Sequence, residues 1–421
     1  MKIITVVGAR PNFMKAAPII AAIEKHNEEL GRSRQDPSCK IDHMLVHTGQ
    51  HYDSLMSDSF FRDLGLPVPD VRLGVGSGSH AIQTAEVLRK FEEVLLVERP
   101  DVVIVVGDVN STVACAMATA KIAFDSAGTR PLLAHVEAGL RSFDRLMPEE
   151  VNRVVTDHIS DVLFATEESG VRNLSREGVA PEVVHFVGNT MIDSLLAFRE
   201  RAECSPILER LGLGRQGEDM APSVDPYAVL TLHRPSNVDS RDTFLNILGG
   251  LEDLAAEYPV VFPVHPRTQR QIKEFGLESY FKMAVNTNAG AEKESAANRK
   301  GVILTDPMGY LDFVCLMSNA MIAVTDSGGI QEETTCLGVP CVTVRDNTER
   351  PVTIESGTNV LGGTTKDGIK RAIRRQMERR PENGMPEKWD GRAASRILNI
   401  LIQTSADRPS PQEVAVLESK I

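Results

Sequence analysis

Short apolar runs alternate with helix-like stretches along the first half of this chain, and this alternation limits the possible folds more than any other feature. Such runs, rich in Val, Ile, Leu and Ala, are the expected strands of the chain. Strands that are apolar along their whole length are typical of a parallel sheet covered by helices on both faces. The predicted strands are Ile3–Val7, His43–His47, Asp101–Val106, Pro131–Val136, Asp161–Ala165 and Val183–Val187.

The second half repeats this pattern after a polar stretch, Gly212–Pro226, which we interpret as a linker. Because 421 residues are too many for one core, the chain is expected to form two domains. We predict an α/β protein with two Rossmann-like domains, residues 1–205 and 206–385, whose parallel sheets face a central cleft. Residues 386–421 are expected to form a C-terminal helix and tail that pack back on the first domain. The predicted second-half strands are Tyr227–Leu232, Val260–Val264, Val302–Thr305, Ala320–Thr325 and Pro340–Val344.

The composition excludes several classes of function. A net charge of −12 argues against a surface for nucleic acid or an anionic membrane. No apolar run approaches the length of about 20 residues that a membrane span needs. The six cysteines are scattered without metal-ligand spacing, so we expect reduced thiols, a cytoplasmic protein and no metal. The first predicted strand is not followed by a Gly-x-Gly-x-x-Gly sequence, which argues against a tightly bound nicotinamide, and no cofactor is expected.

The most informative single stretch is residues 320–333, where an apolar run ends in Asp326 and small residues follow. Ser327, Gly328 and Gly329 would begin a helix, whose first backbone N–H groups and positive dipole end bind phosphate. Glu333, one turn further along, could accept both hydroxyls of a ribose. The pairing suggests a site for a nucleotide diphosphate. The alternative is an ordinary link between strand and helix in which the serine is the N-cap.

Charged residues follow the predicted strands of the first domain. Arg10 and Lys15 are two cations at a strand–helix junction, an arrangement that suits a diphosphate. Asp108, Glu137 and Glu149 follow later strands, and three clustered acids would raise one another's pKa and supply a general acid or base. Taken singly, Asp108 could be an N-cap and Glu149 an ordinary residue of a helix first turn.

The second domain adds histidine, arginine and aromatic candidates. His233 and His265 each follow a predicted strand and could donate to a phosphate or move a proton, although a single histidine is more often structural. Phe313 could face a flat base, and Arg350 follows the last predicted strand. The polar loop Thr48–Asp53 could face the sugar or a second ligand.

The order of these motifs resembles that of a known family, the non-hydrolysing UDP-N-acetylglucosamine 2-epimerases. The resemblance runs from residue 1 to about residue 400. The motifs that carry it are Gly-Ala-Arg-Pro (8–11) with Lys15, Thr-Gly-Gln-His (48–51), Gly-Asp (107–108), His-Val-Glu-Ala-Gly-Leu-Arg (135–141), Pro-Glu-Glu-x-Asn-Arg (148–153), Gly-Asn-Thr (188–190), His-Arg (233–234), Pro-Val-His-Pro (263–266), Thr-Asp-Ser-Gly-Gly-Ile-Gln-Glu-Glu (325–333) and Thr-Glu-Arg-Pro (348–351).

The resemblance implies a glycosyltransferase-B-like fold, a homodimer, and interconversion of UDP-GlcNAc and UDP-ManNAc without a redox cofactor, which would supply ManNAc for surface polysaccharide. It gives Asp108, Glu137 and Glu149 to the catalytic proton chemistry, and we add His233 to these as a catalytic candidate. Glu333 corresponds to the ribose ligand, Phe313 to the aromatic residue of the base site and Arg350 to a further UDP-pocket residue. The matching diphosphate ligands are Arg10, Lys15, His233, Ser327 and Gly328, and we add His265 and Gly329 to the substrate-binding candidates.

The chain departs from the family pattern at two places. Pro235-Ser236 stands where many relatives have Arg-Glu, and Tyr52-Asp53 follows Gln50-His51 in the loop at which UDP-GlcNAc activates some relatives. Four alternative functions stay open. They are a 2-epimerase of UDP-2,3-diacetamido-glucuronate, a hydrolysing epimerase, a UDP-sugar glycosyltransferase, and a sensor that binds a nucleotide sugar without turning it over.

Overall fold

The computed structural model describes residues 1–33, 39–50, 64–217, 220–283, 300–378 and 384–407, and it divides into two compact units. Unit 1 comprises Met1–Ser194 together with the chain from Glu387 onward, and unit 2 comprises Leu195–Pro386. The division at residues 194 and 195 lies within helix α7 (Thr190–Glu203), eleven residues before the boundary expected from the sequence. A continuous helix carries no sequence signal for a change of unit, because its polar and apolar pattern does not break there.

Unit 1 contains a seven-stranded sheet in which every recorded pair of strands is parallel. Its strand order is β3-β2-β1-β4-β5-β6-β7. The six predicted strands are all present, and the two-residue β3 at the edge was too short to be predicted. The strands are β1 (Lys2–Val7), β2 (Asp42–His47), β3 (Val71–Arg72), β4 (Val102–Val106), β5 (Leu132–Ala138), β6 (Val162–Ala165) and β7 (Val184–Phe186).

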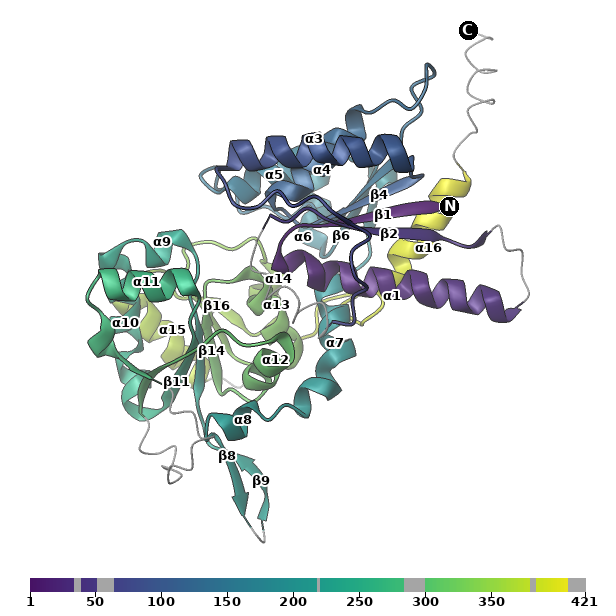
Figure 1. Ribbon diagram of the computed structural model, residues 1–421. Helices are drawn as coiled ribbons and strands as arrows, with labels where there is room; N and C mark the ends of the chain where they lie inside the picture. The colour runs from purple at the N-terminus through teal and green to yellow at the C-terminus, as the bar shows by residue number, and fades with distance from the viewer. Residues whose placement is uncertain (34–38, 51–63, 218–219, 284–299, 379–383, 408–421) are drawn as a thin grey trace. The chain divides into compact units, whose positions relative to one another are not determined.

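Helices cover both faces of this sheet, and each face has its own core (Figure 1). Ile3, Val102 and Ile104 point into a core shared with α1 and α16, whereas Ile4 and Val103 point into one shared with α3 and α4. The alternation explains why the strands are apolar throughout. The helices are α1 (Arg10–Ser33), α3 (His80–Glu98), α4 (Asn110–Lys121), α5 (Pro148–Ile159), α6 (Glu168–Arg176), α7 and α16 (Ala393–Ala406), with a short 3-10 turn at Pro181–Val183.

The C-terminal helix α16 belongs to unit 1 because specific polar groups receive the returning chain. The Asp193 carboxylate accepts the backbone N–H groups of Ala393 (3.2 Å) and Ala394 (2.8 Å), and so caps α16 from another helix. The buried Trp389 donates its indole N–H to the carbonyl of Thr166 at 3.2 Å. Ile397 and Leu401 then complete the core that contains Ile19 and Ile23 of α1.

Unit 2 has a second seven-stranded sheet, again with only parallel pairs recorded, in the order β12-β13-β11-β10-β14-β15-β16. The stretch expected to be a linker contains the antiparallel hairpin of β8 and β9, because a polar, Gly-bearing composition suits a surface hairpin as well as a linker. The strands are β8 (Gly214–Gly217), β9 (Met220–Val224), β10 (Ala228–Thr231), β11 (Pro259–Pro263), β12 (Phe281–Met283), β13 (Gly301–Thr305), β14 (Ile322–Thr325), β15 (Cys341–Thr343) and β16 (Asn359–Leu361).

The helices of unit 2 also lie on both sides of their sheet. One core joins the strands to α10 and α15, and a smaller one joins them to α8 and α12. No helix within the described ranges is long and apolar enough to cross a membrane. The helices are α8 (Ile207–Arg210), α9 (Pro235–Val238), α10 (Arg241–Glu257), α11 (Pro266–Glu274), α12 (Tyr310–Ser318), α13 (Gly328–Leu337), α14 (Val352–Glu355) and α15 (Lys366–Glu378), with a 3-10 turn at Glu278–Tyr280.

Candidate functional site

Glu137 sits on an unusual piece of backbone at the carboxyl end of β5. The pairing of β5 with β6 shifts register between Val136 and Ala138, so that Glu137 is the extra residue of a bulge. Its φ angle is +77°, a left-handed conformation that costs a non-glycine residue about 1 kcal/mol or more. The side chain is nonetheless buried, with 3% of its surface exposed. A strained, buried carboxylate at the edge of a parallel sheet is typical of a functional site.

Lys15 of α1 is the cation that accompanies this carboxylate. Its Nζ lies 2.7 Å from Oε1 of Glu137, and both side chains are almost fully buried. Gly107, with φ +67°, leaves room for this ammonium, because a Cβ there would lie 2.9 Å from Nζ. Lys15 therefore lies at the carboxyl ends of β4 and β5, and its nearest charge in unit 1 is an acid expected to take part in proton transfer.

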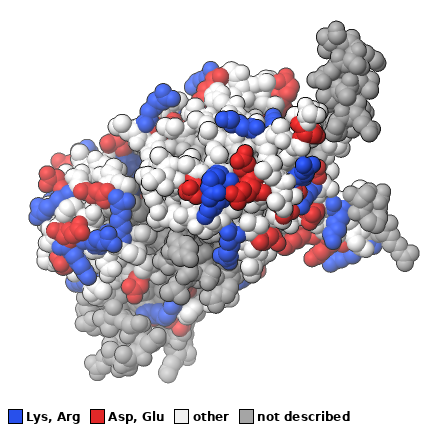
Figure 2. Space-filling model, turned by 45° about the horizontal axis from the view of Figure 1, so that its top comes forward, with Lys and Arg blue, Asp and Glu red and all other residues white. Residues whose placement is uncertain are grey.

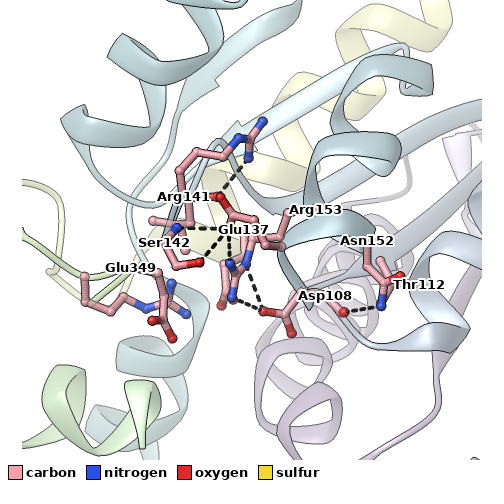
Figure 3. A network of polar contacts seen from close by, with 12 residues as sticks. Asp108, Thr112, Glu137, Arg141, Ser142, Asn152, Arg153 and Glu349 are labelled. Atoms are coloured by element: carbon pink, nitrogen blue, oxygen red, sulfur yellow. Dashed lines mark hydrogen bonds and ion pairs between the residues drawn. The ribbon is translucent and has the colours of Figure 1, made fainter. Parts of the chain in front are cut away.

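Asp108, directly after β4, belongs to a second charged group. Arg153 of α5 donates to its Oδ2 from Nε at 2.9 Å and from Nη2 at 2.8 Å, as Figure 3 shows. The same guanidinium reaches Glu150 at 2.6 Å. Glu150 in turn accepts the backbone N–H groups of Ser142 (2.9 Å) and Phe143 (2.8 Å). Arg153 thus connects a candidate catalytic acid to the loop that leads into α5.

The two neighbouring acids of the first turn of α5 differ in their surroundings. Glu150 is buried and its carboxylate is hydrogen-bonded, whereas Glu149 is half-buried and its side chain forms no hydrogen bond or ion pair with any residue in the described ranges. Sequence reasoning singled out Glu149 and missed both Glu150 and Arg153. The three-residue spacing between Glu150 and Arg153 on a helix was the available signal.

The remaining unit 1 candidates lie beside these groups or outside the described part of the chain. Arg10 begins α1, and its predicted diphosphate contact stays a prediction. Gln50 accepts both the backbone N–H (3.0 Å) and the hydroxyl (2.7 Å) of Ser111, at the start of α4. Residues 51–53, where the loop departs from the family pattern, lie outside the described residues.

In unit 2 a buried aspartate organises the loop after β10. The carboxylate of Asp326, fully buried, accepts the backbone N–H groups of His233 and Arg234 and lies 3.0 Å from Nδ1 of His233. Burial opposes its ionisation, but the charge and hydrogen bonds of His233 outweigh burial, so that the pKa of Asp326 lies below its usual value. His233 itself is exposed, and its ring is oriented by this one carboxylate. The sequence places Asp326 at the end of a predicted strand, but it was not predicted as a site residue.

The predicted phosphate-binding turn has the expected local form. Ser327 is the N-cap residue of α13, and Gly328 and Gly329 are its first two residues. A Cβ on Gly328 would lie 2.7 Å from Oε1 of Glu349, so a larger residue there would require the Glu349 carboxylate to shift. Glu349 is buried and pairs with Arg345 at 2.8 Å. The helix therefore begins with small residues, close to a buried ion pair.

Three other unit 2 candidates are held by nearby groups. Glu333, buried on α13, lies 3.4 Å from the phenol of Tyr310, whose pKa is raised well above its usual value by burial first and then by this carboxylate. Phe313 is half-buried against the core of α8 and α12. Arg350 is buried, and its Nε lies 2.6 Å from Glu332. This pairing favours a role in holding the loop against α13.

His265 has a structural function that the sequence left open. It is the N-cap of α11, and its Nδ1 accepts the backbone N–H of Arg267 at 3.3 Å. His265 is exposed, and its predicted contact with substrate stays a prediction. The role that the structure gives it is to cap α11.

Charge and metal-ligand chemistry limit what else the site could hold. Figure 2 shows basic and acidic side chains interspersed over the face drawn. The net charge of the whole chain is −12. Among the residues that the structure describes, no group of three or more His, Cys, Asp or Glu side chains could hold a metal ion. The arrangement instead offers buried carboxylates in one unit and a glycine-rich helix start in the other.

Comparison with known proteins gives these features a context. Residues 34–402 match a sequence model of a family described as UDP-N-acetylglucosamine 2-epimerase. A protein of that name from Methanocaldococcus jannaschii is 40% identical over 403 residues, which cover 95% of this chain and 99% of the relative. A crystal structure of the M. jannaschii UDP-GlcNAc 2-epimerase with UDP-GlcNAc and UDP superposes with a TM-score of 0.78 at 39% identity, covering 95% of this chain and 99% of that one. A UDP-2,3-diacetamido-2,3-dideoxy-D-glucuronate 2-epimerase from Pseudomonas aeruginosa is 37% identical over 95% of this chain and 99% of its own length.

Proposed function

The chain belongs to the UDP-N-acetylglucosamine 2-epimerase family, and on this premise we propose that it interconverts UDP-GlcNAc and UDP-ManNAc by inverting C2. The observation that carries the proposal is the buried Lys15–Glu137 pair on strained backbone, beside Asp108 at the same edge of the unit 1 sheet. Such a set of groups suits proton transfer to and from carbon. The elimination route proposed below needs no redox cofactor, because none of its steps transfers a hydride or an electron.

The chemistry of the sugar decides the route. The proton on C2 has no neighbouring carbonyl, so its simple removal would leave an unstabilised carbanion. We propose that a carboxylate takes this proton while the C1–O bond to UDP breaks, which forms a double bond between C1 and C2. A carboxylic acid then returns a proton to the opposite face of C2, and UDP adds again at C1. The intermediate is a 2-acetamidoglucal.

Proton transfer is the task that we propose for the three acids of unit 1. Glu137 is held ready by Lys15, and Asp108 by Arg153. Glu149 begins α5 without an ion-pair partner in the described part of the chain, which leaves its carboxyl group available to a substrate. Two of these groups are needed near C2, one on each face of the sugar.

Binding of UDP is the task that we propose for unit 2. The backbone of Ser327, Gly328 and Gly329 at the start of α13 would hold the diphosphate. His233, oriented through Asp326, would donate to the leaving phosphate. The other ligands proposed in unit 2 are Glu333 for the ribose, Phe313 for the base, and Arg350 and His265 around the nucleotide. Arg10 and Lys15 of unit 1 are proposed to bind the diphosphate as well.

The proposal extends to the setting of the enzyme. We propose a cytoplasmic homodimer that supplies ManNAc for surface polysaccharide. Light scattering of the purified protein would test the dimer. Because Tyr52 and Asp53 depart from the activator-binding pattern, we also expect UDP-GlcNAc to give a simple saturation curve and UDP-ManNAc to react without added UDP-GlcNAc.

One experiment tests the reaction and its intermediate together. The protein is incubated with UDP-GlcNAc alone in D₂O, and C2 is followed by NMR. We expect an equilibrium mixture of the two UDP-sugars with one deuterium at C2, and only traces of free UDP and glycal. Stoichiometric release of UDP and ManNAc would instead identify a hydrolysing epimerase. Unchanged UDP-GlcNAc without exchange would contradict the proposal and favour a glycosyltransferase or a sensor.

A second substrate is suggested by one comparison. The P. aeruginosa relative that is 37% identical is named for UDP-2,3-diacetamido-2,3-dideoxy-D-glucuronate. Such a sugar would react by the same elimination, so the same carboxylates would serve. The ratio of kcat/KM for the two UDP-sugars decides between them.

A further inference from the structure

His135 is a buried polar side chain that the proposed reaction does not use. It lies on β5, two residues before Glu137, with none of its surface exposed. Its Nδ1 is 2.7 Å from Oδ1 of Asp157 on α5, and its Nε2 is 2.8 Å from the carbonyl oxygen of Gly107. One ring therefore connects the end of β4 to helix α5.

The partners of His135 determine where its protons are. A carbonyl oxygen only accepts, so Nε2 must donate to Gly107. The contact between Nδ1 and Asp157 then needs a proton as well, carried by one group or the other. Burial opposes ionisation of Asp157, but His135 and Arg141 outweigh it, and the pKa of Asp157 lies below its usual value. Both ring nitrogens of His135 therefore face oxygen atoms that accept hydrogen bonds, the carbonyl of Gly107 and the carboxylate of Asp157.

Asp157 extends this connection to the far side of the β5 bulge. Its Oδ2 accepts the backbone N–H of Gly139 at 3.0 Å and lies 2.7 Å from Nη1 of Arg141. Arg141 also binds Glu177 through two nitrogens, at 2.8 and 2.7 Å. Arg141 thus pairs with both carboxylates, and His135 adds a hydrogen bond to Asp157, which lowers the cost of burying these charges.

The backbone that this group holds is left-handed at three positions, and it is strained at the one that is not glycine, Glu137. Gly107, Glu137 and Gly139 have φ angles of +67°, +77° and +81°. Asp108 follows the first of them, and Glu137 is itself the second. Such turns persist only where surrounding contacts fix them. The His135–Asp157 pair contacts the carbonyl of Gly107 and the N–H of Gly139, and so holds the turns on which both carboxylates stand.

We infer that His135 and Asp157 are positioning residues for proton transfer at C2, acting through the backbone at Gly107 and Gly139 on Asp108 and Glu137. The inference rests on the proposed function, and it assigns a task to a histidine that touches no substrate. A small displacement of a catalytic group costs up to about 10²-fold in rate, so the effect belongs in kcat and not in binding of UDP.

Four variants separate positioning from mere support of the fold. His135→Gln has a single donor nitrogen in place of the two ring nitrogens that contact Asp157 and Gly107, and Asp157→Ala removes the anchor of the ring. Asp157→Asn can keep every contact, since its amide can donate to a neutral His135 while its oxygen accepts from Gly139. His158→Asn is the matched control, because His158 is partly exposed and meets only the outer end of the group, at Glu177.

We expect His135→Gln and Asp157→Ala to lower kcat about 10- to 100-fold, with KM changed less than about 3-fold. Asp157→Asn should stay within about 5-fold of the parent, and His158→Asn should match it. Values are referred to the folded fraction measured by circular dichroism. Parental kcat in folded His135→Gln or Asp157→Ala would overturn the inference, as would an equal loss in Asp157→Asn and Asp157→Ala.

A spectroscopic measurement tests the hydrogen bonds of the His135 ring without relying on enzyme turnover. In protein labelled with ¹⁵N-histidine, both ring nitrogens of His135 should show the shifts of protonated nitrogen, and Asp157→Asn should convert one of them. A neutral ring in the parent protein would overturn the proton arrangement even if the variants do not fold. Absence of epimerisation by the parent would count against the proposed function instead, and the NMR result would still stand.

Discussion

At the scale of single residues, a carboxylate's task in this protein is set by its partner more than by its place in the sequence. Glu137 has a buried lysine, Asp108 and Glu150 share one arginine, and Asp326 is surrounded by donors. Glu137 and Asp108, which we propose for proton transfer, each pair with a buried cation. Glu150 and Asp326 also accept backbone N–H groups, and so hold loops.

The adjacent pair Glu149 and Glu150 tests this distinction directly. Glu149→Gln should lower kcat about 10²-fold or more with unchanged thermal stability, because its carboxyl group is proposed to meet the sugar. Glu150→Gln should instead lower the free energy of unfolding by about 3 kcal/mol, because it breaks a buried pair with Arg153. Kinetics and thermal unfolding are measured on both variants. The reverse pattern would exchange the two assignments.

Glu137 gives a second prediction at this scale. Glu137→Gln should lower kcat about 10²-fold or more, while UDP still binds with similar affinity by calorimetry. The exposed Glu168 supplies a matched control, and Glu168→Gln should leave kcat unchanged. Normal turnover by Glu137→Gln would make this carboxylate, despite its strained backbone, a structural one.

Two histidines of β2 give a prediction of pH dependence. Burial lowers the pKa of His43 and of His47 from 6.5 to about 4. The unfolded chain therefore takes up protons first as the pH falls, so stability is complete above pH 6.5 and is lost progressively towards pH 4. The loss by pH 5 should be on the order of 2 kcal/mol for each of the two residues. Thermal unfolding at pH 7 and pH 5 should show a smaller difference in His47→Gln than in the parent protein, and an equal difference would reject this account.

At the scale of elements, the end of β5 matters more than the regular part of the strand. The bulge turns Glu137 out of the ordinary alternation, and Gly139 then passes close to helix α6. A Cβ at Gly139 would lie 2.4 Å from the carbonyl oxygen of Gly170. The packing of α6 and the position of the proposed catalytic Glu137 therefore depend on the same few residues.

This close approach predicts the effect of one methyl group. Gly139→Ala should lower the free energy of unfolding by about 2 kcal/mol or more, since it combines a left-handed backbone with a backbone clash. It should also lower kcat in the folded fraction. Gly178→Ala is the control for backbone strain alone, because Gly178 also has positive φ but has nothing within 4 Å of its Cβ position. Equal effects of the two changes would show that the contact with α6 is unimportant.

At the scale of the whole molecule, the chain leaves unit 1 after residue 194 and returns to it at Glu387. The returning segment is received by Asp193 and Thr166, and α16 completes a core that α1 and the sheet leave open. Unit 1 is thus built from both ends of the chain, and unit 2 is an insertion between them.

The contribution of α16 can be measured at one buried position. Ile397→Ala should lower the free energy of unfolding by about 2 to 4 kcal/mol, because it leaves a cavity in a fully buried site. Asn399→Ala, on the exposed side of the same helix, should change it by less than about 0.5 kcal/mol. Similar small values for both would mean that α16 adds little to the core of unit 1.

The sequence by itself determined the class of fold and the list of candidate residues. Apolar strands that alternate with helices allow few arrangements other than parallel sheets covered on both faces, and the motifs lie at the carboxyl ends of these strands. Helices and strands depend on local pattern, which a sequence displays directly. The glycine-rich start of α13 was predictable for the same reason.

Only the tertiary structure decided which charges meet. Lys15 and Glu137 are 122 residues apart in the chain, and Asp326 and His233 are 93 apart, so no local pattern connects them. The left-handed backbone of Glu137, the capping of α16 by Asp193 and the His135–Asp157 pair arise in the same way. Burial and pairing depend on what the folded chain brings alongside a residue, and that is a property of the packed molecule rather than of neighbouring residues in the sequence.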